Sequence, residues 1–364
     1  MPNKVVNLSV PSPGIFGLNL EKSQTVLDSR WAIEANNLVF DSSGRIGARK
    51  GTQRTGTTTV GAVDIEQVHE YIDSLGVKTV ILTANNKIYK KDGTSYTDIS
   101  GTITTPTANN WKFVNFNGKC VGFQASHAPI VLATASGSFA DISLSGTDQP
   151  TTVVNEVAAI GGRLFAIDGT NILASDSLDE TTWSLVAIDL KTVWLAGSDV
   201  GTALAEFNDH LVIFGEKSIV VYADPWDPTA ATFISVENIG GIGCIARDTV
   251  QQVGSDIWFL SNSGVRSLGR TIQEKSMPLR ELTKNVRIHL IDHITNETKT
   301  KIRSTYSERE GFYLVSFPTE VEVYCLDVKR PLEDGSARVT KWLTKCTALM
   351  TDSLGTTYVG RGDG

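Results

Sequence analysis

The densest group of polar residues that could do chemistry lies near the start of the chain, in 28-DSRWAIEANNLVFDSSGRIGARKG-51. Acid–base chemistry or the binding of a charged ligand would need Asp28, Arg30 and Glu34 to converge on one point. Their spacing matches no catalytic motif. The residue types instead favour a fastening, in which charged pairs and a turn at Gly44 hold an extended segment against the rest of the fold.

Other patterns that are typical of reactive or binding sites match only in part. The stretch 240-GGIGCIA-246 contains G-x-G-x-x-A, but strand-like residues follow it where a dinucleotide site needs a helix, so a tight turn is expected. His289 and His293 share one helical face without the glutamate of an H-E-x-x-H site. No G-x-S-x-G elbow is present. We therefore expect no catalytic residue, no metal and no cofactor.

The stretch 177-SLDETTW-183 is similar to the aspartate box S-x-D-x-G-x-T-W of sialidase-like propellers, although it lacks the glycine and is one residue short. In that family the box is a structural turn. A retaining glycosidase also needs two carboxylates, or a tyrosine with its base, about 5 Å apart. The sequence singles out no such pair among its 40 acidic residues.

Composition narrows the class of protein further. The chain has 364 residues, of which 41% are hydrophobic, and a net charge of −7. No cluster of Lys or Arg exceeds two residues, which argues against strong electrostatic binding to nucleic acid or to an anionic membrane. No run of about 18 apolar residues occurs, so a soluble protein made in the cytoplasm is expected. The four widely spaced cysteines are expected to be buried free thiols.

A repeat of strand and turn signals runs along the chain. The centres of apolar strands recur every 41 to 56 residues, at Val80, Val121, Leu164, Val212, Ile257, Tyr313 and Thr357. This period is typical of four-stranded propeller blades. The sequence therefore predicts an all-β protein, a β-propeller of about seven blade-like units over residues 61–364. Residues 1–60 form an N-terminal segment that fastens or closes it.

One helix is expected between two of the blades, at about residues 277–294. Ser276 is a plausible N-cap, Pro278 fits the first turn, and apolar residues recur from Leu279 to Ile294 at helical spacing. Its apolar stripe would pack either on its own propeller or on a neighbouring subunit. The last unit has too few strands for a blade, so either the N-terminal segment completes it, with 37-NLVF-40 and 45-RIGARKG-51 as the available filler, or the native chain is longer.

The chain resembles the β-propeller tail proteins of short-tailed bacteriophages, which include nozzle, tail-tube and packaged-DNA stabilisation proteins. The resemblance rests on residues 28–51 and on three blade-like phrases, 162-GRLFAIDGTNILASD-176, 211-LVIFGEKSIVVY-222 and 239-IGGIGCIARDTVQQVGSDIWFLSNSGVRSL-268. After residue 270 only the blade period supports it. The residues assigned to structural pinning, or to contact with a neighbouring subunit or adaptor, are Asp28, Arg30, Glu34, Asn37, Gly44, Arg49 and Gly51.

This resemblance implies a virion structural protein and no enzyme. Six copies would form a ring, a nozzle or tail hub, that continues the DNA channel below the portal and the tail adaptor or head-to-tail connector. The ring would retain the genome and then let double-stranded DNA pass without specific binding. A tail fibre or tailspike is a further partner, and no membrane is involved. The alternatives are a propeller binding module with another partner and a glycan-processing propeller enzyme.

Overall fold

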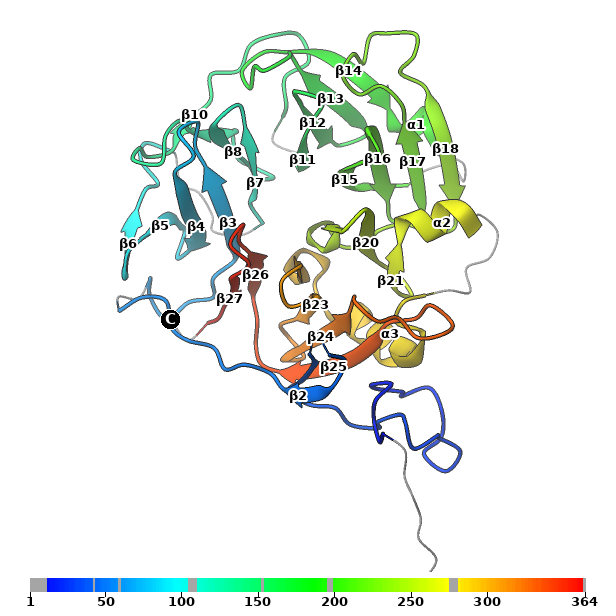
Figure 1. Cartoon of the computed structure of the whole chain (residues 1–364). Coiled ribbons are helices and arrows are strands. Elements are labelled where there is room, and N and C mark those ends of the chain that lie inside the picture. Colours follow the sequence, from blue (N-terminus) through cyan, green and yellow to red (C-terminus); the bar gives the residue numbers. More distant parts are fainter. Residues whose placement is uncertain are drawn as a thin grey trace, which may run out of the picture.

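The computed structural model describes residues 12–41, 43–57, 60–103, 110–151, 154–194, 199–274 and 281–362. Within these ranges the chain forms a ring of antiparallel sheets around a central axis (Figure 1). Five sheets have four strands and one has three, and a two-stranded hairpin stands between the last and the first of them. The predicted β-propeller is confirmed, but it has six blades and a hairpin in place of about seven blade-like units.

The strands of the first three blades follow one another along the chain. Blade 1 contains β3 (Gln67–Ile72), β4 (Lys78–Ala84), β5 (Lys87–Asp92) and β6 (Ser95–Asp98). Blade 2 contains β7 (Lys112–Phe116), β8 (Lys119–Phe123), β9 (Ile130–Leu132) and β10 (Ala140–Asp141). Blade 3 contains β11 (Val154–Ile160), β12 (Arg163–Asp168), β13 (Asn171–Ser175) and β14 (Trp183–Asp189).

The remaining blades continue the order. Blade 4 contains β15 (Gly201–Phe207), β16 (His210–Gly215), β17 (Ser218–Tyr222) and β18 (Ser235–Gly240). Blade 5 contains β19 (Gln251–Val253), β20 (Asp256–Ser261) and β21 (Gly264–Ser267). Blade 6 contains β22 (Arg303–Ser307), β23 (Phe312–Phe317), β24 (Glu322–Asp327) and β25 (Arg338–Leu343). The hairpin pairs β26 (Ala348–Thr351) with β27 (Thr357–Gly360).

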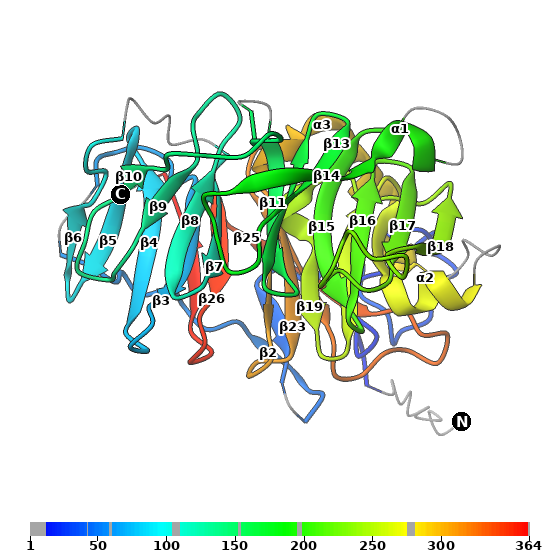
Figure 2. The ribbon, with the colours of Figure 1, turned by 90° about the horizontal axis from the view of Figure 1, so that it is seen from above.

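Blades pack face to face because side chains along a strand point to opposite faces. In β12, Phe165 and Ile167 pack with the strands of blade 4, whereas Leu164 and Ala166 pack with those of blade 2. Seven clusters of buried apolar side chains lie at the junctions around the ring. Figure 2 turns the ring by 90° and shows neighbouring blades standing side by side. The first strand of each blade lies nearest the axis.

The hairpin fills the place between blade 6 and blade 1, because β26 contacts both β22 and β3. Its two faces are buried on different neighbours. Leu349 and Val359 pack against blade 6, and Met350 and Tyr358 pack against blade 1. The ring is thus closed at its inner strands by a unit that has half the strands of a full blade.

The N-terminal segment does not complete this hairpin, which corrects the expected filler. Residues 37–40 and 45–51 do supply two paired strands, β1 (Leu38–Phe40) and β2 (Ile46–Ala48). Their contacts, however, go to β24 and β25 of blade 6. The backbone of the segment bonds to Lys341 and Val339 of β25, so the segment is fastened to the outermost strand of that blade.

The helical parts are shorter and more numerous than the single helix expected at 277–294. They are α1 (Leu190–Val193), α2 (Leu268–Glu274), α3 (Arg287–Asn296) and the 3-10 turns η1 (Arg247–Thr249), η2 (Lys284–Val286) and η3 (Lys299–Lys301). The expected cap and first turn, Ser276, Pro278 and Leu279, lie outside the described residues. A turn at residues 282–283 precedes η2, so α3 begins only at Arg287.

The apolar stripe of this region packs on its own propeller. Leu282, Val286 and Leu290 belong to the cluster between blades 5 and 6, and Ile294 packs against that cluster. All four cysteines are buried and free, as expected. No helix in the described ranges is long and apolar enough to cross a membrane.

The inner and outer faces of α3 give a direct test of this packing. Leu290 is fully buried, whereas Ile288 on the same helix is 56% exposed. Leu290→Ala should lower the free energy of unfolding by about 2–5 kcal/mol. The matched Ile288→Ala change should stay within about 0.5 kcal/mol. Urea denaturation measures both, and equal effects would contradict the assigned orientation of the helix.

Candidate functional site

Two groups of residues are candidates for function, and both hold distant parts of the chain together. The first lies where the N-terminal segment meets β25. Asn37 sits at its centre with a backbone φ of 56°, a left-handed conformation that Asn adopts more readily than most residues. Its amide donates to the carbonyl of Lys341 at 2.6 Å. Its side-chain oxygen accepts from Arg49 Nε at 2.9 Å and from the amide of Leu343 at 3.2 Å.

Arg49 and Gly44 complete this N-terminal clamp. The Arg49 guanidinium lies over the Trp342 ring, 5.6 Å from its centre, in a cation–π contact. Gly44 turns the β1–β2 hairpin at a φ of 81°, and a Cβ there would lie 2.5 Å from Arg330 Nη1. The carbonyl of Gly44 accepts from Arg338, whose guanidinium covers the Phe40 ring. These three predicted residues therefore meet at the outer edge of blade 6.

The other predicted residues lie apart from the clamp. Arg30 binds Asp28 directly through both carboxylate oxygens, with the shortest contact at 2.8 Å, and both side chains are exposed. The hydrogen bonds from the Arg30 side chain and amide lower the pKa of Asp28 to about 2. Glu34 accepts from Asn36 at the surface, and Gly51 has open space around its Cα. The segment is thus split into a local surface pair and a long-range clamp.

The second group is a buried charge network near the axis that sequence reasoning missed: Lys112, Glu156, Arg247, Asp248 and Arg303. Lys112 begins β7, Glu156 lies on β11, and Arg303 begins β22, so the charges come from different blades. Lys112 Nζ lies 2.9 Å from Glu156 Oε1, and Arg247 Nε lies 3.3 Å from Glu156 Oε2. Asp248 lies between the two arginines, 3.0 Å from Arg247 and 3.1 Å from Arg303.

The two arginines also donate to backbone carbonyls of other blades. Arg247 reaches Asn155 of blade 3 at 2.8 Å and Trp111, just before blade 2, at 3.3 Å. Arg303 reaches the carbonyl of Glu66, just before blade 1, at 3.1 Å. Because a guanidinium has five donors in a fixed plane, each arginine can tie several chain segments at once. Arg247 thus links the chain before blade 5 to blades 2 and 3, and Arg303 links blade 6 to blade 1. Together the two arginines hold five of the six blades.

Burial and charge act on the two carboxylates in opposite directions. Glu156 is only 1% exposed, and its burial raises its pKa to about 7 against the pull of Lys112 and Arg247. Burial also opposes the ionisation of Asp248, but Arg247 and Arg303 outweigh it and hold the pKa of Asp248 well below its usual value. Asp248 is thus the permanent anion of the network, while Glu156 changes charge near neutrality.

The motifs that suggested chemistry have structural partners. Asp179 of the aspartate-box stretch accepts from the amide and hydroxyl of Thr181, at 2.8 and 2.7 Å, and so closes a turn before the buried Trp183. In the glycine-rich stretch, the Cys244 amide donates to the carbonyl of Gly215, which makes an inter-blade turn. His293 lies 3.0 Å from Glu322, whereas His289 is exposed.

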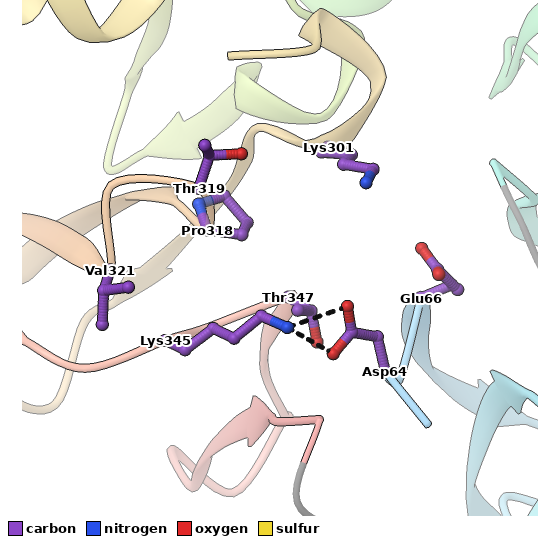
Figure 3. Close-up of a pocket in the computed structure, with 8 residues that line it drawn as sticks. All are labelled: Asp64, Glu66, Lys301, Pro318, Thr319, Val321, Lys345 and Thr347. Carbon is purple, nitrogen blue, oxygen red and sulfur yellow. Dashed lines mark hydrogen bonds and ion pairs between the residues drawn. The ribbon is translucent and has the colours of Figure 1, made fainter. Parts of the chain in front are cut away.

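A cavity of about 300 Å³ lies between the β23–β24 turn and the residues that enter β3 and β26. Figure 3 shows its lining, in which Lys345 contacts both carboxylate oxygens of Asp64. Lys301 and Glu66 add one further charge of each sign. The lining therefore carries two charges of each sign. A second cavity, of about 200 Å³, is lined by the inner strands and includes Lys112 and Arg303.

Comparisons with known proteins support the fold alone. No family model matches the chain, and no curated protein matches it in sequence. PorZ, a bacterial surface component of the type-IX secretion system of Porphyromonas gingivalis, has a similar structure, with a TM-score of 0.52 and 16% identity over 83% of this chain. The match covers 36% of PorZ. The computationally designed Ika8 protein gives a TM-score of 0.49 and 12% identity, over 86% of this chain and 98% of that one.

Removing the side chain of Asn37 tests the clamp. Asn37→Gly keeps the left-handed backbone accessible but deletes the acceptor that Arg49 and Leu343 share. We expect a loss of about 1–3 kcal/mol in the free energy of unfolding and faster proteolysis of the segment. Gly51→Ala, in open space, should change neither measurement. A segment that stays protected in Asn37→Gly would show that the side chain is dispensable.

Cutting the axial network should cost more. Arg247→Met leaves Asp248 short of a cation and leaves several carbonyls without a donor, so we expect a loss of about 3–5 kcal/mol in chemical denaturation. Arg54→Met removes an exposed arginine for which no partner is found in the described ranges, and should change stability by about 0.5 kcal/mol or less. Similar effects for the two variants would contradict the assigned role.

Glu156 predicts a specific pH dependence. Its pKa is about 7 in the folded chain and 4.5 for an ordinary glutamate, so the unfolded chain loses this proton first as the pH rises. The contribution of Glu156 to stability is therefore complete below about pH 4.5 and is lost progressively up to about pH 7. Glu156→Gln should remove this fall. Parallel stability curves for wild type and variant across that window would refute the assignment.

Proposed function

We propose that this chain is a virion structural protein of a short phage tail, and not an enzyme. Several copies, most simply six, form a ring that serves as a nozzle or tail hub below the portal and adaptor. The ring retains the packaged genome and then lets it pass. The observation that carries this proposal is that the segment resembling the N-terminal pattern of those tail proteins is a structural fastening of a propeller.

The contacts of that segment support the proposal. Within residues 28–51, Asn37, Gly44 and Arg49 bind or approach blade 6, and Asp28 pairs with Arg30. The other phrase with the longest resemblance, residues 239–268, contains Arg247 and Asp248 of the axial network. The residues that resemble the family are therefore residues that hold the architecture together. Relatives that share an architecture but bind different partners would retain such residues.

The position of the DNA path follows from the same network. Ion pairs and arginine–carbonyl contacts link the blades around the propeller axis, so in our proposal the DNA passes between copies and not through one propeller. A net charge of −7 suits a channel wall that repels phosphates. The adaptor and a tail fibre or tailspike would bind the ring at its two ends.

Exposed apolar residues supply a candidate contact between copies. The stripe near α3 is buried on its own propeller, so it does not provide this contact. Leu75, in the β3–β4 turn, is 86% exposed and Leu354, in the β26–β27 turn, is 70% exposed. The two turns are neighbours, because Ser353 accepts from Lys78 and binds Glu70. Adjacent exposed leucines are typical of interaction surfaces.

Assembly tests the proposal. Negative-stain images and sedimentation of the purified chain, alone and with adaptor-bearing heads, should show rings or ring-capped heads. Leu75→Asp combined with Leu354→Asp should abolish assembly while the chain stays folded, because it places charges in the proposed contact. Leu178→Asp, also at an exposed leucine but on another turn, is the control. A chain that stays monomeric at high concentration and is not taken up by such heads would exclude the tail role.

A further inference from the structure

The cavity of about 300 Å³ lies at the junction where the ring closes, and separate parts of the chain meet in its lining. Glu66 lies just before β3 of blade 1, Lys301 ends η3 before blade 6, and Thr347 leads into β26 of the hairpin. The β23–β24 turn of blade 6 supplies the rest of the lining. The volume is at the small end of the range of ligand pockets. A small molecule bound there touches both ends of the ring at once.

The four charged side chains of the lining divide into one bound pair and two unpaired charges. Lys345 Nζ lies 2.7 and 3.0 Å from the two carboxylate oxygens of Asp64, so these charges satisfy each other. The carboxylate of Glu66 and the ammonium of Lys301 have neither a hydrogen-bond nor an ion-pair partner among the described residues. Figure 3 shows these two side chains pointing toward each other, with no ion pair drawn between them. The cavity therefore offers one unpaired charge of each sign.

The side of the cavity away from Lys301 and Glu66 carries an apolar residue in a strained conformation. Val321 lies there (Figure 3), is 46% exposed, and has a backbone φ of 58°. This left-handed conformation is rare for a β-branched residue and costs on the order of 1–3 kcal/mol; strain of this kind clusters at ligand sites. Glu297 holds the same turn, because it accepts from the Thr319 amide at 2.7 Å and from its hydroxyl at 2.8 Å. The apolar side chain is thus presented on a fixed turn.

One buried polar atom of the lining also lacks a partner. Thr347 is 6% exposed, and its hydroxyl oxygen forms no hydrogen bond within the described part of the chain. A buried hydroxyl left without a hydrogen bond costs about 1–3 kcal/mol. Because most buried polar groups are satisfied, an exception in the wall of a cavity favours a site that a polar ligand completes.

We propose that this cavity binds a small zwitterion, an α-amino acid with an apolar side chain. Its ammonium group pairs with Glu66, its carboxylate pairs with Lys301, and its side chain lies toward Val321. A simple anion would leave Glu66 without a partner, and a simple cation would leave Lys301 without one, whereas a zwitterion satisfies both. The bound amino acid joins blade 1 to the chain that enters blade 6, so it stabilises the closed ring. The inference does not depend on the proposed tail function.

Calorimetric titration of the full chain with L-leucine tests the class of ligand. We expect L-leucine to bind and to raise the midpoint of thermal unfolding, because it binds the folded chain. The probes 4-methylpentanoate, which lacks the ammonium group, and 3-methylbutylamine, which lacks the carboxylate, should each bind at least about tenfold more weakly, which is about 1.4 kcal/mol. Equal binding of either probe would show that the two charges do not act together. That result, or no binding of L-leucine, L-valine or L-phenylalanine at millimolar concentration, would overturn the proposal.

Two variants locate the site. Glu66→Gln and Lys301→Met each remove one of the two charges, so each should weaken the binding of L-leucine at least about tenfold. The matched controls, Glu308→Gln and Lys191→Met, change exposed residues outside the cavity and should bind as the wild type does. Wild-type affinity in either cavity variant would place the ligand elsewhere and refute the site.

Unfolding of the same variants without ligand supplies the second test. If Glu66 and Lys301 await a ligand, the effects of the two changes on the free energy of unfolding should add in the double variant. A coupling of about 1 kcal/mol or more between them would show that the two side chains pair with each other in solution. That result would also overturn the proposal, whether or not L-leucine binds.

Discussion

The contact between Asp248 and the two arginines beside it is the constraint on which the ring depends. Blades of a propeller pack through apolar faces. Such faces alone allow one blade to rotate slightly against another at a small cost in free energy. A buried carboxylate held by Arg247 and Arg303 removes that freedom, because separating either arginine from Asp248 leaves a charge unpaired at low dielectric. The carbonyls that the same arginines bind extend this restraint to blades 1, 2 and 3.

The N-terminal clamp holds the outer strands of the propeller, far from the axial network. The hairpin closes the inner circle of strands but leaves the outer circle incomplete between blades 6 and 1. The N-terminal segment is anchored on β25 by Asn37 and then reaches blade 1 through residues 50–57, here called the strap, which Lys50 anchors on Glu310 and Thr57 on Thr94. The inner circle is therefore joined by strands and the outer circle by a covalent crossing of the chain. This division explains why the clamp carries specific side-chain contacts while the strap stays exposed.

The sequence predicted the parts of the fold that depend on period. Strand centres such as Leu164 and Val212 fall within observed strands, because alternation along a strand is a local property. Gly44 and Asn37 were also recognisable, since each needs a backbone conformation that few residues adopt. The axial network was not, because Glu156, Arg247 and Arg303 lie far apart in sequence and no local pattern marks a charge as buried. The nearest signal was the Arg247–Asp248 dipeptide directly after the glycine-rich stretch 240–246.

Predictions about helices and closure failed where tertiary packing decided the outcome. The helical spacing from Leu279 to Ile294 indicated one helix, yet the turn before η2 breaks it because Leu282 and Val286 are drawn into the cluster between blades 5 and 6. The expected filler strands formed as predicted, but the side chains on β25 offered them better partners than the hairpin did. The sequence indicates that a segment will form a strand. It does not indicate which other strand that segment will contact.

The clamp has a consequence for synthesis of the chain. Asn37 binds Leu343, a residue 306 positions later, so the fastening cannot form until blade 6 has left the ribosome. At about 5–20 residues per second, the N-terminal segment waits roughly 15–60 s for its partner. Blades 1 to 5 have emerged by then and each can pack on its predecessor, whereas the first residues remain without their binding strand. Closure of the propeller therefore comes late in the synthesis of each molecule. The clamp forms as the last step.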